Sequence, residues 1–229
     1  MCGRYTLTTT GEQLAEEFDL IDVPPVTPRY NVAPTQMVPV VRMYAEDAPA
    51  RRLDQLKWGL IPHWAREAGI GSRMINARSE EAANKPAFRT PLRRQRCLVP
   101  CTGFFEWQAA DPGIKSAKKQ PYYIHRRDDH PLGFAGLWDR WHDPDGNVIE
   151  SFTILTTSPS ELMRPLHNRM PVIIPRAEYA LWLDPQVQDP ARLAHLLAPF
   201  TDDALIARPV STRVNNVRFD DPGCIAAAN

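Results

Sequence analysis

The order of apolar and polar residues along the chain predicts mainly β-strands. Strands are expected over 38–44, 53–60, 97–107, 122–126, 133–140, 148–157, 170–174 and 205–210. Asp145 and Gly146 form a hairpin-turn pair between two of these strands. Many strands with few helices predict an α+β single domain, with a mainly antiparallel sheet that curls into a barrel-like core flanked by a few short helices.

Helical patterns are short and few. Thr10 and Gln13 have the spacing of a capping box, and Leu14 and Phe18 then share one face, so a helix is expected over 11–19. Other segments are predicted from their composition and capping residues. These are helices over 79–90, 177–183 and 190–198, an extended proline-rich segment over 24–39, and exposed connections over 45–52 and 109–120.

Composition is that of a water-soluble globular protein. The chain has 229 residues, 43% of them hydrophobic and 24% charged, which suits one sizeable domain or two small ones. No apolar run approaches the ~20 residues of a membrane helix, and the N-terminus lacks the pattern of a secretory signal. We therefore expect no membrane association, and a cytoplasmic location in which free thiols persist.

Four cysteines are too few for a disulfide scaffold of this length. Cys97 and Cys101 could form half of a zinc site, but no second half-site follows. The apolar residues between them favour a buried strand instead. No metal site is expected.

Charge is balanced overall and uneven locally. The net charge is zero, yet 73–96 contains seven basic residues against two acidic ones. Such a segment either binds a phosphate backbone or forms a solvated surface whose arginines pair with nearby acids. Charge alone does not separate these two alternatives.

Cys2 is the most informative single residue. Once an aminopeptidase removes Met1, the chain begins with an amine and a thiol on adjacent carbons. Both groups titrate near neutrality, and together they can close on an aldehyde to form a thiazolidine ring. The same pair could act as an N-terminal nucleophile in hydrolysis, or Cys2 could be an ordinary terminal residue.

Two residues are candidates for proton transfer. Glu106 follows two aromatic residues and precedes Trp107, so its pKa should be raised toward neutrality, unless it lies on the exposed face of its strand. His167 lies between a Pro-Leu turn and a strand start, where it could act as an acid and base or play only a structural role.

Polar and aromatic residues suited to nucleic acid surround these candidates. Asn76 and Arg78 alternate, so an extended backbone would point both to one face, where they could orient a polar substrate and a phosphate. Trp64 precedes the basic segment and could stack on bases. Alternatively, Asn76 caps a turn, Arg78 is merely exposed and Trp64 packs in the core. For the nearby Trp58, the core position is favoured.

Six motifs in order resemble the SOS response-associated peptidase (SRAP) family, including its YedK-type members. The resemblance extends to about residue 217 and leaves 218–229 as a C-terminal tail of a single domain. The motifs are Met1-Cys2-Gly3-Arg4-Tyr5, Arg29-Tyr30-Asn31-Val32-Ala33-Pro34, Trp58-Gly59-Leu60-Ile61-Pro62, Ile75-Asn76-Ala77-Arg78-Ser79-Glu80, Gly103-Phe104-Phe105-Glu106-Trp107 and His167-Asn168-Arg169-Met170-Pro171.

This resemblance implies a DNA repair protein that crosslinks to abasic sites in single-stranded DNA, without metal or cofactor. Cys2 would form the thiazolidine with the sugar aldehyde, Glu106 would move protons, His167 would assist opening of the sugar, and Asn76 would hold the amine. It also implies the DNA contacts: Arg4, Arg78 and Arg169 to phosphates and Trp64 to the kinked strand. Some relatives have two adjacent tryptophans where this chain has His63-Trp64, which makes that contact less secure.

Three functions stay open at this point. The favoured function is covalent shielding of abasic sites by a monomer that joins the bacterial nucleoid when bound to DNA. The alternative is an N-terminal-nucleophile cysteine peptidase, which could include self-removal of Met1. The third is a non-enzymatic DNA-binding module.

Overall fold

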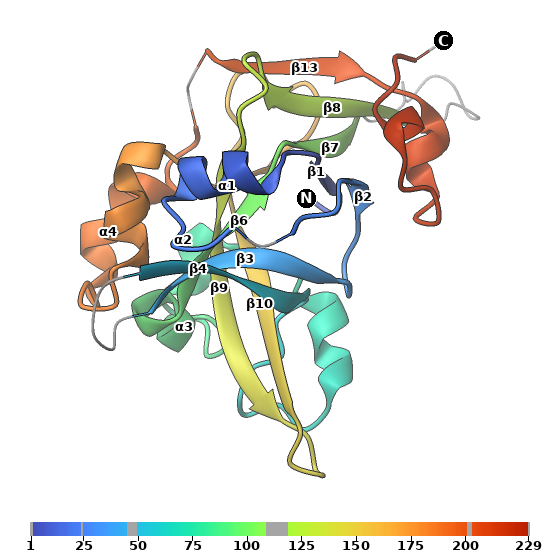
Figure 1. Cartoon of the computed structure of the whole chain (residues 1–229). Helices are drawn as coiled ribbons and strands as arrows, with labels where there is room; N and C mark the ends of the chain where they lie inside the picture. The colour runs from blue at the N-terminus through green and yellow to red at the C-terminus, as the bar shows by residue number, and fades with distance from the viewer. Residues whose placement is uncertain (1, 24, 45–49, 109–118, 201–202, 229) are drawn as a thin grey trace.

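Five strands close into a barrel in the computed structural model, which describes residues 2–23, 25–44, 50–108, 119–200 and 203–228 (Figure 1). The ring closes because β10 pairs with both β4 and β9. All pairs within it are antiparallel except β10 with β4. The predicted α+β class with a barrel-like, mainly antiparallel core is therefore confirmed. The barrel strands are β3 (Met37–Tyr44), β4 (Ala50–Trp58), β6 (Arg96–Cys101), β9 (Leu132–His142) and β10 (Val148–Thr157).

A second antiparallel sheet holds the N-terminal segment. Its order is β13-β8-β7-β1-β2, and Tyr5 of β1 pairs with Phe104 of β7. The chain passes from β6 in the barrel to β7 in this sheet across a single residue, Thr102. The strands are β1 (Tyr5–Leu7), β2 (Arg29–Val32), β7 (Gly103–Gln108), β8 (Gln120–Arg126) and β13 (Leu205–Pro209).

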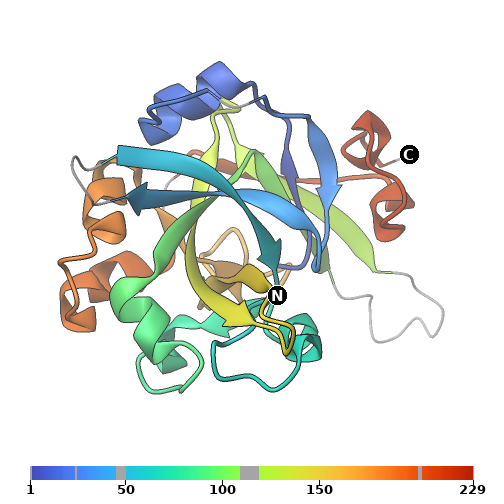
Figure 2. The same cartoon turned by 60° about the horizontal axis from the view of Figure 1, so that its bottom comes forward.

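Short helices surround the two sheets, as Figure 2 shows, and three further short strands extend the barrel's sheet by pairing with β9 or β10. Thr10 caps the first helix in a complete capping box with Gln13, as its sequence predicts. The α-helices are α1 (Gly11–Phe18), α2 (Ser79–Ala82), α3 (Arg89–Arg94) and α4 (Tyr179–Leu183). The 3-10 helices are η1 (Ala68–Arg73), η2 (Arg176–Glu178), η3 (Pro190–Leu197), η4 (Thr212–Asn215) and η5 (Pro222–Cys224). The remaining strands are β5 (Asn76–Arg78), β11 (Met170–Pro171) and β12 (Ile173–Ile174).

The helix expected over 79–90 is wrong as a single element. The chain forms α2, a series of turns, and then α3. Pro86 lies in the break, where it has no N–H to continue a helix.

The strand expected over 97–107 is also two strands, β6 and β7, in different sheets. Thr102 forms the corner, since its hydroxyl accepts a 3.1 Å hydrogen bond from Thr8 N and lies 2.8 Å from the Thr6 hydroxyl. That side chain therefore fastens the bend to the segment that follows Cys2. Likewise, 170–174 contains two short strands, β11 and β12, with different partners.

Several other boundaries differ from expectation. β4 begins at Ala50 and ends at Trp58, before Gly59. The proline-rich segment contains β2 and the start of β3, and the helix expected over 190–198 is the 3-10 helix η3. Two expected connections lie largely outside the described residues, at 45–49 and 109–118.

Residues 218–228 pack against β2. Asp220 accepts hydrogen bonds from the main-chain N–H groups of Tyr30 and Asn31 and from the Arg29 guanidinium. Asn31 in turn donates from its side chain to the carbonyl of Phe219 at 2.7 Å. The C-terminal segment is therefore fastened to the sheet that holds the N-terminus.

Candidate active site at the N-terminus

The end of β10 brings two predicted site segments together. β5 runs parallel to β10, with Arg78 opposite Thr156. β11 pairs on β10 at the same level, with Pro171 opposite Thr156. Asn76 and Arg78 therefore lie on one strand beside the segment that carries His167 and Arg169.

The N-terminal segment crosses from this place to β7. The main-chain N–H of Phe105 donates a 3.0 Å hydrogen bond to the carbonyl of Arg4. The side-chain amide of Asn76 donates a 2.8 Å hydrogen bond to the carbonyl of Cys2. These bonds place Cys2 between the strands that carry Asn76 and Glu106.

The Cys2 thiol lies in the hydrophobic core. Its residue has 0% exposure and belongs to the same apolar cluster as Tyr5, Trp58 and Phe134. Burial, and then the nearby Glu106 carboxylate, raise the pKa of the Cys2 thiol far above its usual value. In the chain that carries Met1 the group is therefore a neutral thiol.

Glu106 is buried beside Cys2. It is 2% exposed, and burial raises the pKa of Glu106 to about 7. The raised pKa expected from its aromatic neighbours is thus confirmed, and the exposed alternative is wrong. A carboxyl group with this pKa is present in both protonation states near neutrality, which suits it to move protons.

His167 is held by the backbone that follows it. Its Nδ1 lies 2.9 Å from the main-chain nitrogen of Arg169 and 3.1 Å from the carbonyl oxygen of the same residue. Burial lowers the pKa of His167, so the neutral form of the ring predominates at pH 7. A neutral imidazole can accept a proton at one ring nitrogen and donate a hydrogen bond from the other.

Arg169 is engaged by a residue that the sequence did not single out as a site residue. Its guanidinium donates to both oxygens of Glu80, at 2.7 and 2.8 Å, and also reaches the carbonyl of Thr156. This fork-like pair lowers the pKa of Glu80. In the sequence, the only indication that Glu80 lies near the site is that it belongs to the same motif as Asn76.

Arg4 also makes protein contacts. Its guanidinium donates to Asn31 Oδ1 at 2.9 Å and to the carbonyl of Val214 at 2.7 Å. Arg78 is more open, with a side chain that is 62% exposed and 3.4 Å from Glu81. The Arg78 side chain is therefore far more exposed than that of Arg169, which is 16% exposed.

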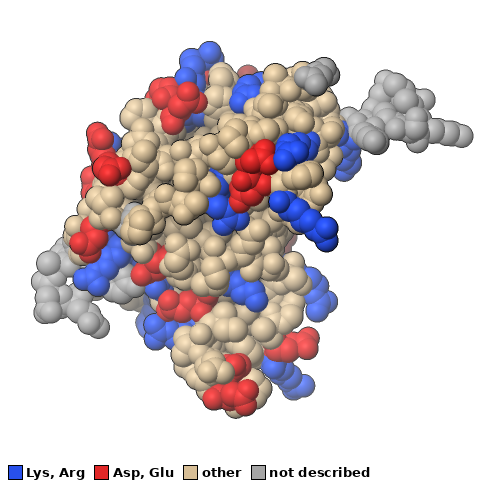
Figure 3. Space-filling model, turned by 45° about the vertical axis from the view of Figure 1, so that its right-hand side comes forward, with Lys and Arg blue, Asp and Glu red and all other residues tan. Residues whose placement is uncertain are grey.

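Only part of the basic segment 73–96 is paired with acids or buried. Arg78 and Lys85 both pair with Glu81, and Arg96 is 5% exposed. On the face shown in Figure 3, basic and acidic side chains are interspersed. Pairing with a nearby acid therefore describes Arg78 and Lys85, whereas Arg73, Arg89, Arg93 and Arg94 are exposed.

Trp64 is exposed and Trp58 is buried, at 50% and 0% exposure. The core alternative is thus wrong for Trp64 and right for Trp58. Trp64 borders a cavity of about 370 Å³ together with four other residues. These are His63, Pro86, Arg89 and Thr90.

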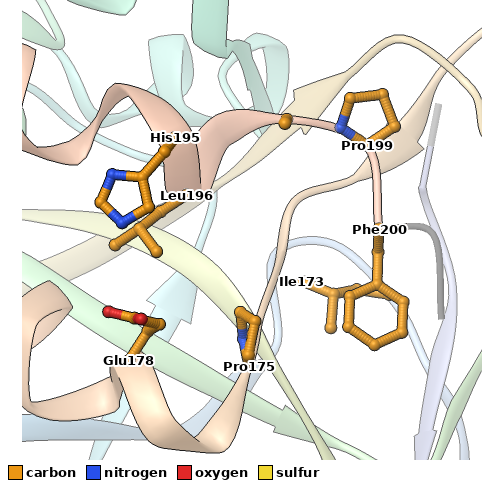
Figure 4. Close-up of a pocket in the computed structure, with 8 residues that line it drawn as sticks. Ile173, Pro175, Glu178, His195, Leu196, Pro199 and Phe200 are labelled. Carbon is orange, nitrogen blue, oxygen red and sulfur yellow. The ribbon is translucent and has the colours of Figure 1, made fainter.

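A separate cavity of about 410 Å³ contains none of the predicted site residues. Figure 4 shows His195 and Glu178 on one side of it and Ile173 with Phe200 on the other. Across the part of the chain that the structure describes, no group of three or more His, Cys, Asp or Glu residues could hold a metal ion. No helix of the described residues is long and apolar enough to cross a membrane.

The chain is similar to known proteins over nearly its whole length. A family model described as SOS response associated peptidase (SRAP) matches residues 1–217, which include every candidate site residue. The chain is 40% identical over 228 residues to the abasic site processing protein YoqW of Bacillus subtilis (strain 168), across 98% of this chain and 99% of that protein. It is 32% identical to the abasic site processing protein HMCES of Xenopus tropicalis, across 87% of this chain and 66% of that protein. A crystal structure from Bacteroides thetaiotaomicron matches with a TM-score of 0.83 at 28% identity, with 100% of both chains covered.

Proposed function

This chain belongs to the SOS response associated peptidase (SRAP) family, and from that premise we propose that Cys2, once Met1 is removed, crosslinks to abasic sites in single-stranded DNA. The observation that carries the proposal is the position of Cys2 between two polar side chains. The amide of Asn76 donates a 2.8 Å hydrogen bond to the Cys2 carbonyl, and the buried Glu106 on the other side has a pKa of about 7. The relatives named above process abasic sites, and an abasic sugar in its open form is an aldehyde.

The reaction needs two bond-forming steps. The free amine of Cys2 adds to the aldehyde carbon, and loss of water gives an imine. The Cys2 sulfur then bonds to the same carbon while its proton moves to the nitrogen, which closes the thiazolidine. Glu106 donates the proton that releases water and accepts the thiol proton. Asn76 holds the terminal segment in position, and His167 donates to the ring oxygen of the sugar as it opens.

Phosphate binding would come from the arginines around Cys2. Arg78 is open to a phosphate, whereas Arg169 and Arg4 would act while also held by Glu80 and Asn31. Trp64 would stack on a base of the bound strand.

An intact-mass measurement tests the proposal. The purified chain, with and without Met1, is incubated with an abasic oligonucleotide, and its mass is compared with the sum expected for an adduct that has lost one water. Cys2→Ala should give no adduct, while Cys224→Ala, which removes another buried cysteine, should react normally. Equal adduct from a chain with a permanent N-terminal extension would overturn the thiazolidine.

A second candidate activity is self-removal of Met1, because Glu106 lies beside Cys2 and could transfer a proton to the departing amine. The chain would be purified with Met1 in place and incubated alone. A mass loss of one Met residue that Cys2→Ala and Glu106→Gln abolish would support self-cleavage. Retention of Met1 without an added aminopeptidase would exclude it.

A further inference from the structure

A buried carboxylate holds the loop that carries Trp64. Asp139 of β9 is 3% exposed. Its Oδ2 accepts hydrogen bonds from the main-chain N–H of His63 at 2.8 Å and lies 3.0 Å from His63 Nδ1. Its Oδ1 accepts a 2.8 Å hydrogen bond from the main-chain N–H of Arg140 and lies 3.4 Å from the amide of Gln95. A buried carboxylate costs free energy unless it is well hydrogen-bonded, and both contacts of Oδ2 come from the residue next to Trp64.

The other side of Trp64 is held by the same strand. Trp141, two residues beyond Asp139 on β9, is 4% exposed. Its indole N–H donates to the carbonyl of Ala65 at 2.7 Å. Residues two apart on a strand point to the same face, so Asp139 and Trp141 hold the residue on each side of Trp64 from one surface.

The loop closes on itself between these two points. The main-chain N–H of Ala65 donates to the carbonyl of Pro62 at 2.8 Å, and the N–H of Ile61 donates to the buried hydroxyl of Ser151 at 2.8 Å. Trp64 is nevertheless 50% exposed. A large exposed indole on a loop with both neighbours fixed is the arrangement of a preorganised contact residue.

We propose that Asp139 and Trp141 are positioning residues that fix Trp64 in the orientation in which it stacks on a base of single-stranded DNA. The inference rests on the proposed function, because it takes DNA as the ligand. Stacking needs a ring held at a defined angle, and a loose loop would have to be ordered on binding at a cost in affinity. The cavity beside Trp64, with Arg89 on its wall, leaves room for the stacked base.

The positioning role and simple electrostatics predict opposite effects of losing Asp139 on DNA affinity. Loss of the Asp139 charge near a polyanion would strengthen DNA binding, whereas loss of its positioning role weakens it. The neighbouring strand offers a matched control in Glu150. This carboxylate pairs with Arg42 and Arg140 and makes none of the loop bonds described above.

The experiment measures the equilibrium affinity for an undamaged single-stranded oligonucleotide, and in parallel the adduct rate against abasic DNA concentration. Trp64→Ala should weaken affinity about tenfold, as expected for one lost stacking contact. Asp139→Ala and Trp141→Phe should weaken it several-fold, and Asp139→Asn less, because an amide oxygen can still accept from His63 N. The adduct rate at saturating DNA should not change, and Glu150→Gln should bind as the native chain does.

Double variants separate positioning from general loss of structure. If Asp139 acts through Trp64, then Asp139→Ala in the Trp64→Ala background should cause no further loss of affinity. Trp141→Phe removes the indole N–H together with the five-membered ring, keeps an aromatic side chain, and provides the same test if Asp139→Ala fails to fold. The inference would be overturned if the losses of affinity in Asp139→Ala and Trp64→Ala added up in the double variant. It would also be overturned if Asp139→Asn and Trp141→Phe both bound with native affinity, or if Trp64→Ala did. Absence of a Cys2 adduct would instead contradict the proposed function and leave this affinity test intact.

Discussion

The side-chain amide of Asn76 donates a 2.8 Å hydrogen bond to the main-chain carbonyl of Cys2, across a separation of 74 residues. The other polar atom of this side chain, Oδ1, is buried and has no hydrogen-bond partner among the described residues. One end of the amide therefore fixes the reactive segment, and the other end is available to a donor such as a newly formed terminal amine.

Replacement of Asn76 by Asp should disable the site. A carboxylate has no donor for the Cys2 carbonyl and repels it. We expect a stability loss of about 1–3 kcal/mol and an adduct rate at least about tenfold lower, measured by chemical unfolding and by gel-resolved adduct formation. Asn84→Asp makes the same change at an exposed position and should leave both unchanged. A native adduct rate in Asn76→Asp would show that the bond has no role in the reaction.

The buried Glu106 should make stability depend on pH. Its pKa is about 7 in the folded chain against 4.5 for an ordinary glutamate, so the folded state binds the extra proton between these values. Stability should therefore fall as pH rises through this window, by up to about 3 kcal/mol from this group.

Glu106→Gln removes that titration. Urea unfolding at pH 5 and at pH 8 should show a smaller loss of stability in this variant than in the native chain. Parallel curves for the two proteins would mean that Glu106 ionises in the folded state as easily as in the unfolded one.

Arg169→Ala should reduce the salt dependence of DNA binding. Each phosphate contact to a single strand contributes about −0.7 to the slope of log affinity against log salt, so loss of one contact makes the slope shallower by about that amount. Arg176→Ala is a suitable control, because this half-exposed arginine pairs with Asp19 and contacts α1. An unchanged slope in Arg169→Ala would leave Arg169 as a structural partner of Glu80 only.

Gly59 should tolerate no side chain. Its φ is +126°, and an added Cβ would lie 2.6 Å from the carbonyl oxygen of Gly71. Gly59→Ala should cost about 2–3 kcal/mol, whereas Gly146→Ala, with a φ of +85° and open space around it, should cost only about 1 kcal/mol. Thermal unfolding of the two variants gives the comparison, and equal losses would remove the steric argument.

The sequence predicts elements where local signals suffice. The capping box at Thr10 and the strand predicted over 148–157 both correspond to observed elements, α1 and β10. The short strands β1 and β5 have no local signal, because three residues show no period and are stabilised by partners far along the chain.

Site residues divide in the same way. Chemistry made Cys2 and Glu106 candidates, since the aminothiol that loss of Met1 would leave and a carboxylate among aromatic residues are unusual in themselves. Glu80 and Asp139 act through contacts with residues 89 and 76 positions away, and a single sequence carries no record of such pairings. The exposure of Trp64 likewise depends on how the whole loop is held.

The complete burial of Cys2 has a consequence for its survival in the cell. Diffusible oxidants and alkylating agents attack exposed thiolates, and this sulfur is neither exposed nor ionised in the chain that carries Met1. The burial of Cys2 therefore keeps this thiol reduced without a protecting partner.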